Sequence, residues 1–374
     1  MATPLILLHA ADIPAALTLA TQHADLVVLV FDPGLVDRAV AAGLPRVHCM
    51  QWDDAPPHLE RADEATRLSR TLGDTLDALV EPVWPGLALG SWQQLSLFYL
   101  HSSLLWYSGL AASVCHRLPE GRVHIPFTDN PQTYYFPSFV PALLLLQQLQ
   151  REGRVYQAFT HGSKPLPTQP VPALHGVRTP GGRPYLLTHL PTCFYDAEHI
   201  NRELAHSGHT VVDLTARYWH VPIGTAPSVP TAEADAMFDT LPADQQARIT
   251  DVLQRLQAPL DAHLARWLQA AGFRARQLAQ LLAAYRAQLV TLCLLQQHFA
   301  RQAPLRLLVS DHDTDFHGPL SAYARAQQVP MLVLPHSKTS TDLDFVARDA
   351  TVLCHAIQGD PVYDVRGHRP LQAT

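Results

Sequence analysis

The sequence has few charges and lacks the common catalytic signatures. Charged side chains make up 16% of the 374 residues, and the net charge is −6 at pH 7 with histidine neutral, so nothing favours a nucleic-acid partner. There is no P-loop, no GxSxG elbow and no HExxH pair, and the first predicted turn has no GxGxxG. These absences argue against P-loop hydrolases, elbow-type serine esterases, zinc proteases of the HExxH class and Rossmann dinucleotide enzymes.

Cysteine and long apolar runs are also scarce. The five cysteines are far apart and form no CxxC pair, which predicts neither a zinc ribbon nor a disulfide framework and fits a reducing compartment. The longest apolar runs, near 140–146 and 289–295, are shorter than the roughly 20 residues of a membrane-spanning helix. We therefore expect a cytoplasmic protein without a transmembrane segment. The apolar start, Pro4–His9, is interpreted as a first strand and not as a signal peptide.

The chain is instead built from apolar strands that alternate with helical patterns. Strands are expected at 4–9, 26–31 and 46–52 with helices between them, and this βαβαβ opening predicts a doubly wound parallel sheet. Two further strands are expected at 123–128 and 155–159. The strand at 26–31 is all apolar, as expected of a parallel strand that is buried on both faces.

The same pattern begins again after a linker. Residues 164–184 are rich in proline and glycine and have no periodicity, which is typical of a linker. A strand at 185–189, a helix at 197–206 and a strand at 210–214 follow, and helices are expected over 243–302. We therefore predict an α/β fold with two Rossmann-like domains, 1–170 and 184–374. No residue-level repeat between the two halves is evident.

The densest cluster of reactive side chains follows the strand predicted at 305–309. Ligands of open α/β sheets bind beyond the carboxyl ends of the strands, so we predict the site in this loop. Aspartate and histidine at alternate positions suit acid–base catalysis or a divalent metal, and an aspartate there equally suits the cap of the next helix. These alternatives stay open for Asp311, His312, Asp313, Asp315 and His317.

Polar residues follow three other predicted strands. The strand 329–334 leads into Pro335-His336-Ser337-Lys338-Thr339, where backbone N–H groups and an ammonium can hold a phosphate or a carboxylate. The strand 155–159 leads into 160–164, which includes His161, and the strand 185–189 ends in His189. The alternative is an ordinary turn at the first two positions and a packed histidine at the third.

A helix expected over 92–118 is rich in tryptophan, tyrosine and phenylalanine. We interpret these aromatic side chains as core packing. The alternative is a platform on which a sugar ring or a base stacks.

The segment 309–339 resembles the end of the N-terminal domain of GT-B glycosyltransferases of bacterial surface polysaccharides. The resemblance rests on a strand, an acidic loop, a helix with alanine, then Val329-Pro330, an apolar strand and Pro335-His336. Ser337 stands where glycine is usual in that family. Residues 185–214 look like the first βαβ unit of such a domain, and the resemblance implies two Rossmann-like domains that face each other across a cleft.

The resemblance also implies an activity. The chain would move a sugar from a nucleotide-activated donor to a glycan or lipid-linked acceptor in surface polysaccharide assembly, without a cofactor and with peripheral membrane contact. Asp311, Asp313 and His336 would be catalytic, and Lys338 would contact the leaving phosphate. The substrate would further contact His161, His189, His312, Ser337 and Thr339. The alternatives are a metal-dependent hydrolase or phosphoesterase that uses the 311–317 loop, and a non-catalytic α/β module of a larger assembly.

Overall fold

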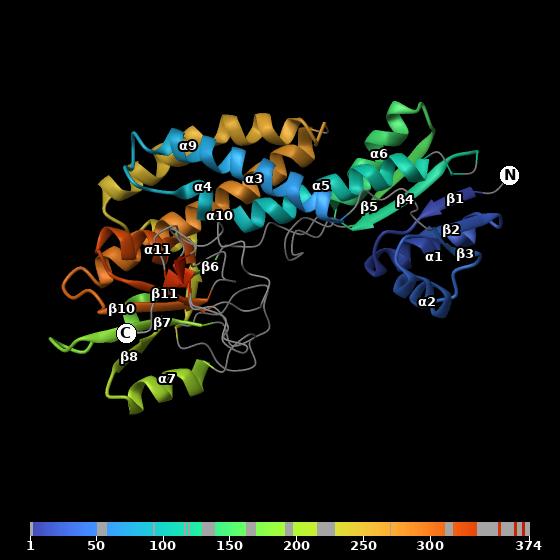
Figure 1. Ribbon diagram of the computed structural model, residues 1–374. Coiled ribbons are helices and arrows are strands. Elements are labelled where there is room, and N and C mark those ends of the chain that lie inside the picture. The colour runs from blue at the N-terminus through green and yellow to red at the C-terminus, as the bar shows by residue number, and fades with distance from the viewer. Residues whose placement is uncertain are drawn as a thin grey trace. The chain divides into compact units, whose positions relative to one another are not determined.

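The chain forms two compact units in the computed structural model (Figure 1). The first unit comprises Met1–Ser69, Leu97–Pro167 and Asp261–Leu278, and the second comprises Arg70–Ser96, Thr168–Leu260 and Ala279–Thr374. The structure describes residues 3–50, 58–92, 94–115, 117–118, 120–128, 139–161, 170–190, 197–214, 229–269, 271–310, 317–334, 351–352, 363–364 and 369–370.

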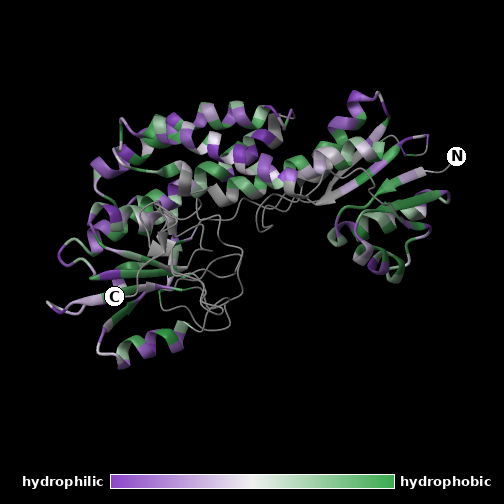
Figure 2. Ribbon diagram, in the orientation of Figure 1, coloured by the Kyte–Doolittle hydropathy of each residue, from purple (hydrophilic) through white to green (hydrophobic). Residues whose placement is uncertain are grey.

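The first unit contains a parallel sheet of five strands in the order β3-β2-β1-β4-β5. These strands are β1 (Thr3–Ile6), β2 (Leu26–Val30), β3 (Val47–Cys49), β4 (Val123–Thr128) and β5 (Tyr156–His161). The apolar runs that predicted β1 and β2 are buried, and Figure 2 shows both strands largely in green. Burial on both faces explains why these strands carry no polar alternation.

Two short helices cover the start of this sheet. The 3₁₀ turn η1 (Ala10–Asp12) leads into α1 (Ile13–Gln22), and α2 (Pro33–Ala41) follows β2. Asp32 caps α2, because its carboxylate accepts a hydrogen bond of 2.9 Å from the Gly34 N–H. Leu19 of α1 and Leu35 of α2 belong to the same buried cluster as the leucines and valines of β1 and β2.

Long helices complete the first unit. They are α6 (Phe139–Arg151), most of α5 (Gln94–Cys115), and parts of α3 (His58–Val80), α9 (Ala243–Ala265) and α10 (Ala271–His298). Gln147 of α6 ties the distant segment around 267–269 to this unit. Its side-chain amide donates to the Trp267 carbonyl (2.9 Å) and accepts from the Gln269 N–H (2.8 Å).

The second unit contains a seven-stranded sheet in the order β8-β7-β10-β11-β12-β13-β14. The first five of these strands are parallel, and β13 and β14 pair antiparallel. They span β7 (Tyr185–His189), β8 (Thr210–Asp213), β10 (Arg306–Ser310), β11 (Met331–Leu334), β12 (Thr351–Val352), β13 (Tyr363–Asp364) and β14 (Arg369–Pro370). The prediction of a mixed α/β protein with parallel sheets in both halves is therefore confirmed.

Several shorter elements also belong to the second unit. They are α4 (Leu89–Trp92), α7 (Ala197–His206), α8 (Ala234–Phe238), α11 (His317–Ala326), the turn η2 (Leu174–Gly176) and an antiparallel ribbon of β6 (Pro170–Pro172) with β9 (Thr231–Glu233). The core includes three aromatic rings that contact one another at tilted angles. The Phe299 ring lies 6.3 Å from that of Tyr185 and 5.9 Å from that of Tyr323, centroid to centroid.

The units are not two consecutive stretches of sequence. Residues 70–96 belong to the second unit and 261–278 to the first, whereas the sequence pattern placed 1–170 and 184–374 in separate domains. The helices α3, α9 and α10 begin in one unit and end in the other.

Among the described residues, one helical stretch, Arg274–His298, has the length and apolar composition of a membrane span. Inside the structure, 67% of its most apolar window is buried. A core helix of a water-soluble protein meets the same criterion, so this finding is weak evidence for a membrane segment.

Candidate functional site

The carboxyl ends of three neighbouring strands lie at one edge of the second sheet. The chain runs from β7 to β8 on one side and returns through β10 and β11 on the other, so the strand order reverses between β7 and β10. His189, the last residue of β7, is paired with Val309, and Ser310, the last of β10, is paired with Leu334. Such a reversal is where open α/β sheets bind ligands.

His189 is fixed at this edge. Its ring is buried, and Nδ1 lies 3.1 Å from the carbonyl oxygen of Leu214. A carbonyl only accepts, so the hydrogen is assigned to Nδ1, and in the neutral ring Nε2 is an acceptor. The Leu214 N–H donates in turn to the Thr188 carbonyl (2.7 Å). The end of β7 is thus tied to the residue that follows β8.

Most of the predicted site residues follow these strand ends in the sequence but lie outside the described residues. This holds for the loop after β10, with Asp311, His312 and Asp313, and for the loop after β11, with His336, Ser337, Lys338 and Thr339. His161 is the last residue of β5 and therefore belongs to the first unit, whereas His189 belongs to the second. The roles assigned to these residues stay predictions.

The first sheet has a corresponding reversal between β1 and β4. Here β1 leads through His9 and η1 into α1, and η1 packs against β4. The turn contains Ala10 and Ala11 where a dinucleotide-binding turn needs glycine. Asp12 is fully buried at the start of α1, where the partial positive charge of the helix terminus favours a carboxylate.

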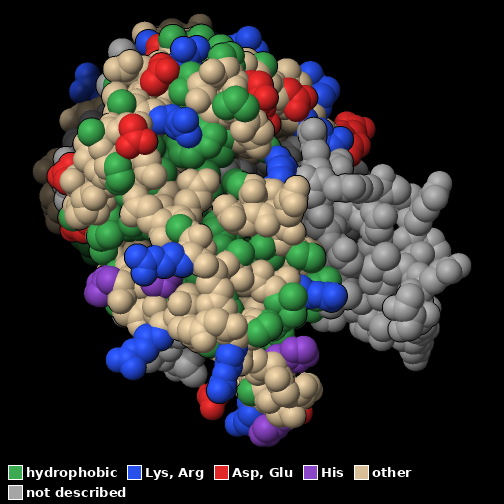
Figure 3. Space-filling model, turned by 90° about the vertical axis from the view of Figure 1, so that its left-hand side faces the viewer, with side chains coloured by type: hydrophobic (Ala, Val, Ile, Leu, Met, Phe, Trp, Pro, Cys, Tyr) green, Lys and Arg blue, Asp and Glu red, His purple; other side chains and the backbone are tan. Residues whose placement is uncertain are grey.

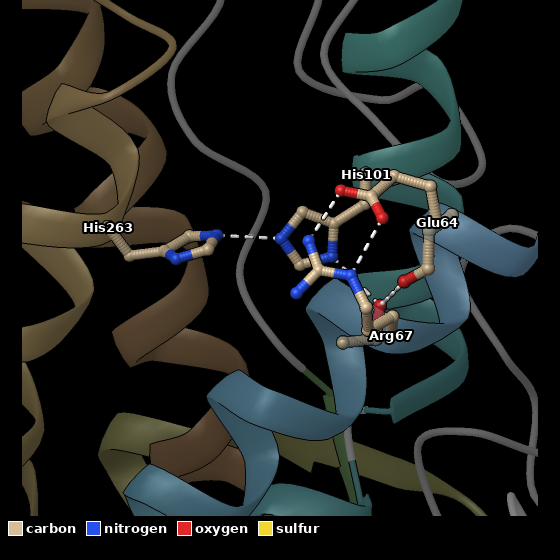
Figure 4. A network of polar contacts seen from close by, with 6 residues as sticks. Glu64, Arg67, His101 and His263 are labelled. Carbon is tan, nitrogen blue, oxygen red and sulfur yellow. Dashed lines mark hydrogen bonds and ion pairs between the residues drawn. The ribbon is translucent and has the colours of Figure 1, made fainter. Parts of the chain in front are cut away.

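A buried chain of polar groups, which the sequence analysis did not predict, joins three helices of the first unit. Figure 4 shows His101 between the exposed Glu64–Arg67 ion pair and His263. The Ser69 hydroxyl of α3 lies 2.8 Å from Nδ1 of His101 on α5, and Nε2 of His101 lies 2.6 Å from Nε2 of His263 on α9. All three side chains are at most 9% exposed, so their hydrogen bonds are shielded from water.

Only one arrangement of hydrogens satisfies this chain. The Ser69 hydroxyl also lies 2.7 Å from the carbonyl oxygen of Ala65, which can only accept, so the hydroxyl donates to that carbonyl. Ser69 then accepts from Nδ1–H of His101, and His263 donates from Nε2 to Nε2 of His101. The serine proton is therefore committed to the backbone. Together with burial, this rules out a Ser–His nucleophile here despite the resemblance to a catalytic triad.

Burial keeps both rings neutral. Desolvation first, and then repulsion from His263, lower the pKa of His101 to about 3, although the Leu97 backbone and Glu64 oppose the shift. The pKa of His263 is also lowered, by desolvation first and then by Arg266. At neutral pH the pair is a neutral donor and a neutral acceptor that link α5 to α9.

The aromatic helix predicted over 92–118 is α5. Its leucines at positions 97, 100 and 104 are buried. The guanidinium of Arg61 lies 3.9 Å from the ring centroid of Trp106, so one face of this ring is covered by a cation–π contact. For Trp106 this contact favours packing over the alternative of a stacking platform.

The described residues contain no group of three or more histidine, cysteine, aspartate or glutamate side chains that could hold a metal ion. The 311–316 segment, for which the sequence left a metal as an alternative, is not among them. The described cysteines Cys49, Cys115 and Cys293 are free thiols.

No known protein-family model, curated protein or solved structure matches this chain. Its own strand order and side-chain chemistry are therefore the basis on which its function is inferred.

Proposed function

We propose that the chain is a glycosyltransferase of GT-B type, which moves a sugar from a nucleotide-activated donor to a glycan or lipid-linked acceptor in cytoplasmic steps of surface polysaccharide assembly. One observation carries the proposal. The edge of the second sheet where β7, β10 and β11 end is followed in the sequence by an Asp/His loop and by His336-Ser337-Lys338. The GT-B arrangement, with two facing Rossmann-like domains, is part of the proposal.

The proposed chemistry matches these residue types. Glycosyl transfer builds positive charge on the sugar and negative charge on the leaving phosphate. Asp311 or Asp313 would supply the carboxylate, and Lys338 would stabilise the leaving phosphate. His336 would donate a hydrogen bond to the donor.

The acceptor side of the proposal includes peripheral contact with a membrane. Figure 3 shows one face of the molecule, on which histidine side chains lie in the lower half, acidic ones mostly toward the top, and arginine side chains at both the top and the bottom. The membrane contact is therefore proposed from the class of acceptor alone.

The proposal is tested by nucleotide binding. A nucleoside mono- or diphosphate that binds only the native state raises the melting temperature, and the expected result is a shift with at least one base. Lys338→Ala removes a charge-assisted contact to phosphate and should weaken binding about tenfold or more. The control is Arg178→Ala, which removes an exposed cation of the same unit and should bind as the wild type does.

Two other results would contradict the proposal. A stoichiometric divalent metal in the purified full chain, with hydrolysis of a phosphoester, would favour the metal-dependent hydrolase. No shift with any nucleotide, sugar or metal would favour a non-catalytic module.

A further inference from the structure

A group of exposed arginines lies at the amino ends of β7 and β10, at the edge of the second sheet opposite to the proposed site. Arg183 lies two residues before β7, and Arg306 is the first residue of β10. Arg178 follows η2, and Arg301 lies between α10 and β10. All four residues are exposed. We call this surface the arginine edge.

Hydrogen bonds hold the two segments of the arginine edge side by side. The Gln302 side chain accepts from the Gly182 N–H (3.1 Å) and donates to the Arg183 carbonyl (2.6 Å). The Tyr185 hydroxyl donates to the Gln302 carbonyl (2.7 Å), and the Leu305 N–H donates to the Tyr185 carbonyl (2.7 Å). Because these bonds involve the backbone of both segments, the fold itself brings the arginines to one edge.

The four arginine side chains have no partner within the described part of the chain, where no hydrogen bond or ion pair involves them. The sequence contains no aspartate or glutamate over 174–190 or over 262–310, so neither segment supplies a carboxylate. Elsewhere in the second unit, arginines form ion pairs with carboxylates: Arg202, Arg255 and Arg286.

This edge is suited to an anionic partner with an apolar surface layer. Unpaired cations repel one another, and the net charge of the chain is −6, so gathering four of them at one edge does not stabilise the fold. Leu305 lies among these arginines, and its side chain is 52% exposed. Peripheral proteins combine cations, which attract anionic headgroups, with apolar side chains that enter the membrane interface.

We infer that the arginine edge is a docking surface for an anionic lipid membrane. The surface follows from the arginines and Leu305, whereas the choice of a membrane over another anionic partner rests on the proposed function, whose acceptor is lipid-linked. The strand β7 has 5 residues and therefore rises roughly 16 Å. The proposed site beyond its carboxyl end would face a glycan that projects from the membrane, so docking and nucleotide binding use opposite edges of one sheet.

Co-sedimentation of the full chain with vesicles tests the inference. The protein should bind phosphatidylglycerol vesicles and not phosphatidylcholine vesicles, and added salt should weaken binding because it screens the arginines. Each charge lost in the triple variant Arg183→Gln, Arg301→Gln, Arg306→Gln should lower the partition coefficient about fivefold, and the three together about a hundredfold. Leu305→Gln should weaken binding without a change of charge.

The matched control removes three exposed arginines of the first unit, by Arg38→Gln, Arg122→Gln and Arg151→Gln. Its net charge equals that of the triple variant, and it should bind vesicles as the wild type does. An equal loss of binding in both variants would show that net charge sets the binding, and would overturn the inference.

Melting with nucleotides separates this inference from the proposed function. The triple variant should show the same nucleotide-dependent shift as the wild type, because the arginine edge lies away from the proposed site. Vesicle binding that the triple variant loses supports the inference even where no nucleotide raises the melting temperature. A wild type that binds nucleotide but no vesicles overturns the inference alone, and binding to polyglutamate without binding to vesicles overturns it in favour of an acidic protein partner.

Discussion

His101 lies between Ser69 and His263 in the chain of buried polar groups. This position determines how protonation at low pH affects the hydrogen bonds of the first unit. In the neutral state Nδ1 of His101 faces the Ser69 hydroxyl, and Nε2 faces Nε2 of His263. One proton can be added on the far side of His263 without breaking the chain. A second proton, on Nε2 of His101, would place two N–H groups against each other, so the link between α5 and α9 would be lost.

We predict that this histidine makes the protein sensitive to acid. The pKa of His101 is about 3 in the folded chain, below the usual value near 6.5, so the unfolded chain binds the proton more tightly. The contribution of His101 to stability is therefore constant above about pH 6.5 and falls between there and about pH 3, by up to about 1.4 kcal/mol per pH unit. His101→Gln should flatten the slope of the unfolding free energy between pH 7 and pH 5, measured by urea denaturation.

The matched control for this substitution is His175→Gln, at an exposed histidine of η2. It should leave the slope unchanged. An unchanged slope in His101→Gln would show that the buried ring does not set the acid response.

The contacts among Ser69, His101 and His263 could not be predicted from the sequence, and the reason is physical. Ser69 and His101 are 32 positions apart, and His101 and His263 are 162 apart. Each side chain lies in an otherwise ordinary helical pattern, and only tertiary packing brings them together. By contrast, the strand ending in His189 could be predicted, because its signal is a local apolar run.

At the scale of elements, α3 and α4 contact through glycines. A Cβ atom at Gly90 would collide with the Gly73 carbonyl, whereas one at Gly73 would lie 3.3 Å from the Gly90 carbonyl oxygen. The Gly90 N–H also donates to the Asp77 carboxylate. The backbones of these two helices thus approach as closely as the absence of side chains allows.

We therefore predict that Gly90→Ala destabilises the second unit strongly. The new Cβ would collide with backbone atoms of Gly73, which cannot rotate away as a side chain can. The two helices must therefore move apart, at a cost of about 3 kcal/mol or more. Gly73→Ala should cost less. Gly176→Ala is the control, since a Cβ there meets nothing within 4 Å. The melting temperatures of the three variants test this ranking, and a Gly90→Ala protein as stable as the control would refute it.

Local sequence patterns predicted the helices and strands better than they predicted how these elements pack. Short, mostly apolar runs predicted β1, β2, β4, β5, β7, β10 and β11, and the long helical stretch expected over 243–302 contains α9 and α10. Periodicity states which face of a helix is apolar but not which sheet that face covers. The passage of α3, α9 and α10 from one unit into the other could therefore not be read from the sequence.

At the scale of the whole molecule, the shared helices make the two units interdependent in folding. A fragment of residues 1–170 would lack 261–278, which belongs to the first unit, and would contain 70–96, which belongs to the second. We predict that this fragment does not melt cooperatively by circular dichroism, whereas the full chain does. Cooperative melting of the fragment would show that the first unit folds without the segment that Gln147 holds.

The most direct test of the account is a crystal structure of the full chain with a bound nucleoside diphosphate. The account predicts that the diphosphate lies beyond the carboxyl ends of β7, β10 and β11, near His189 and within reach of Lys338. A diphosphate bound elsewhere on the second unit, or a site at this edge filled by the chain's own side chains, would contradict it.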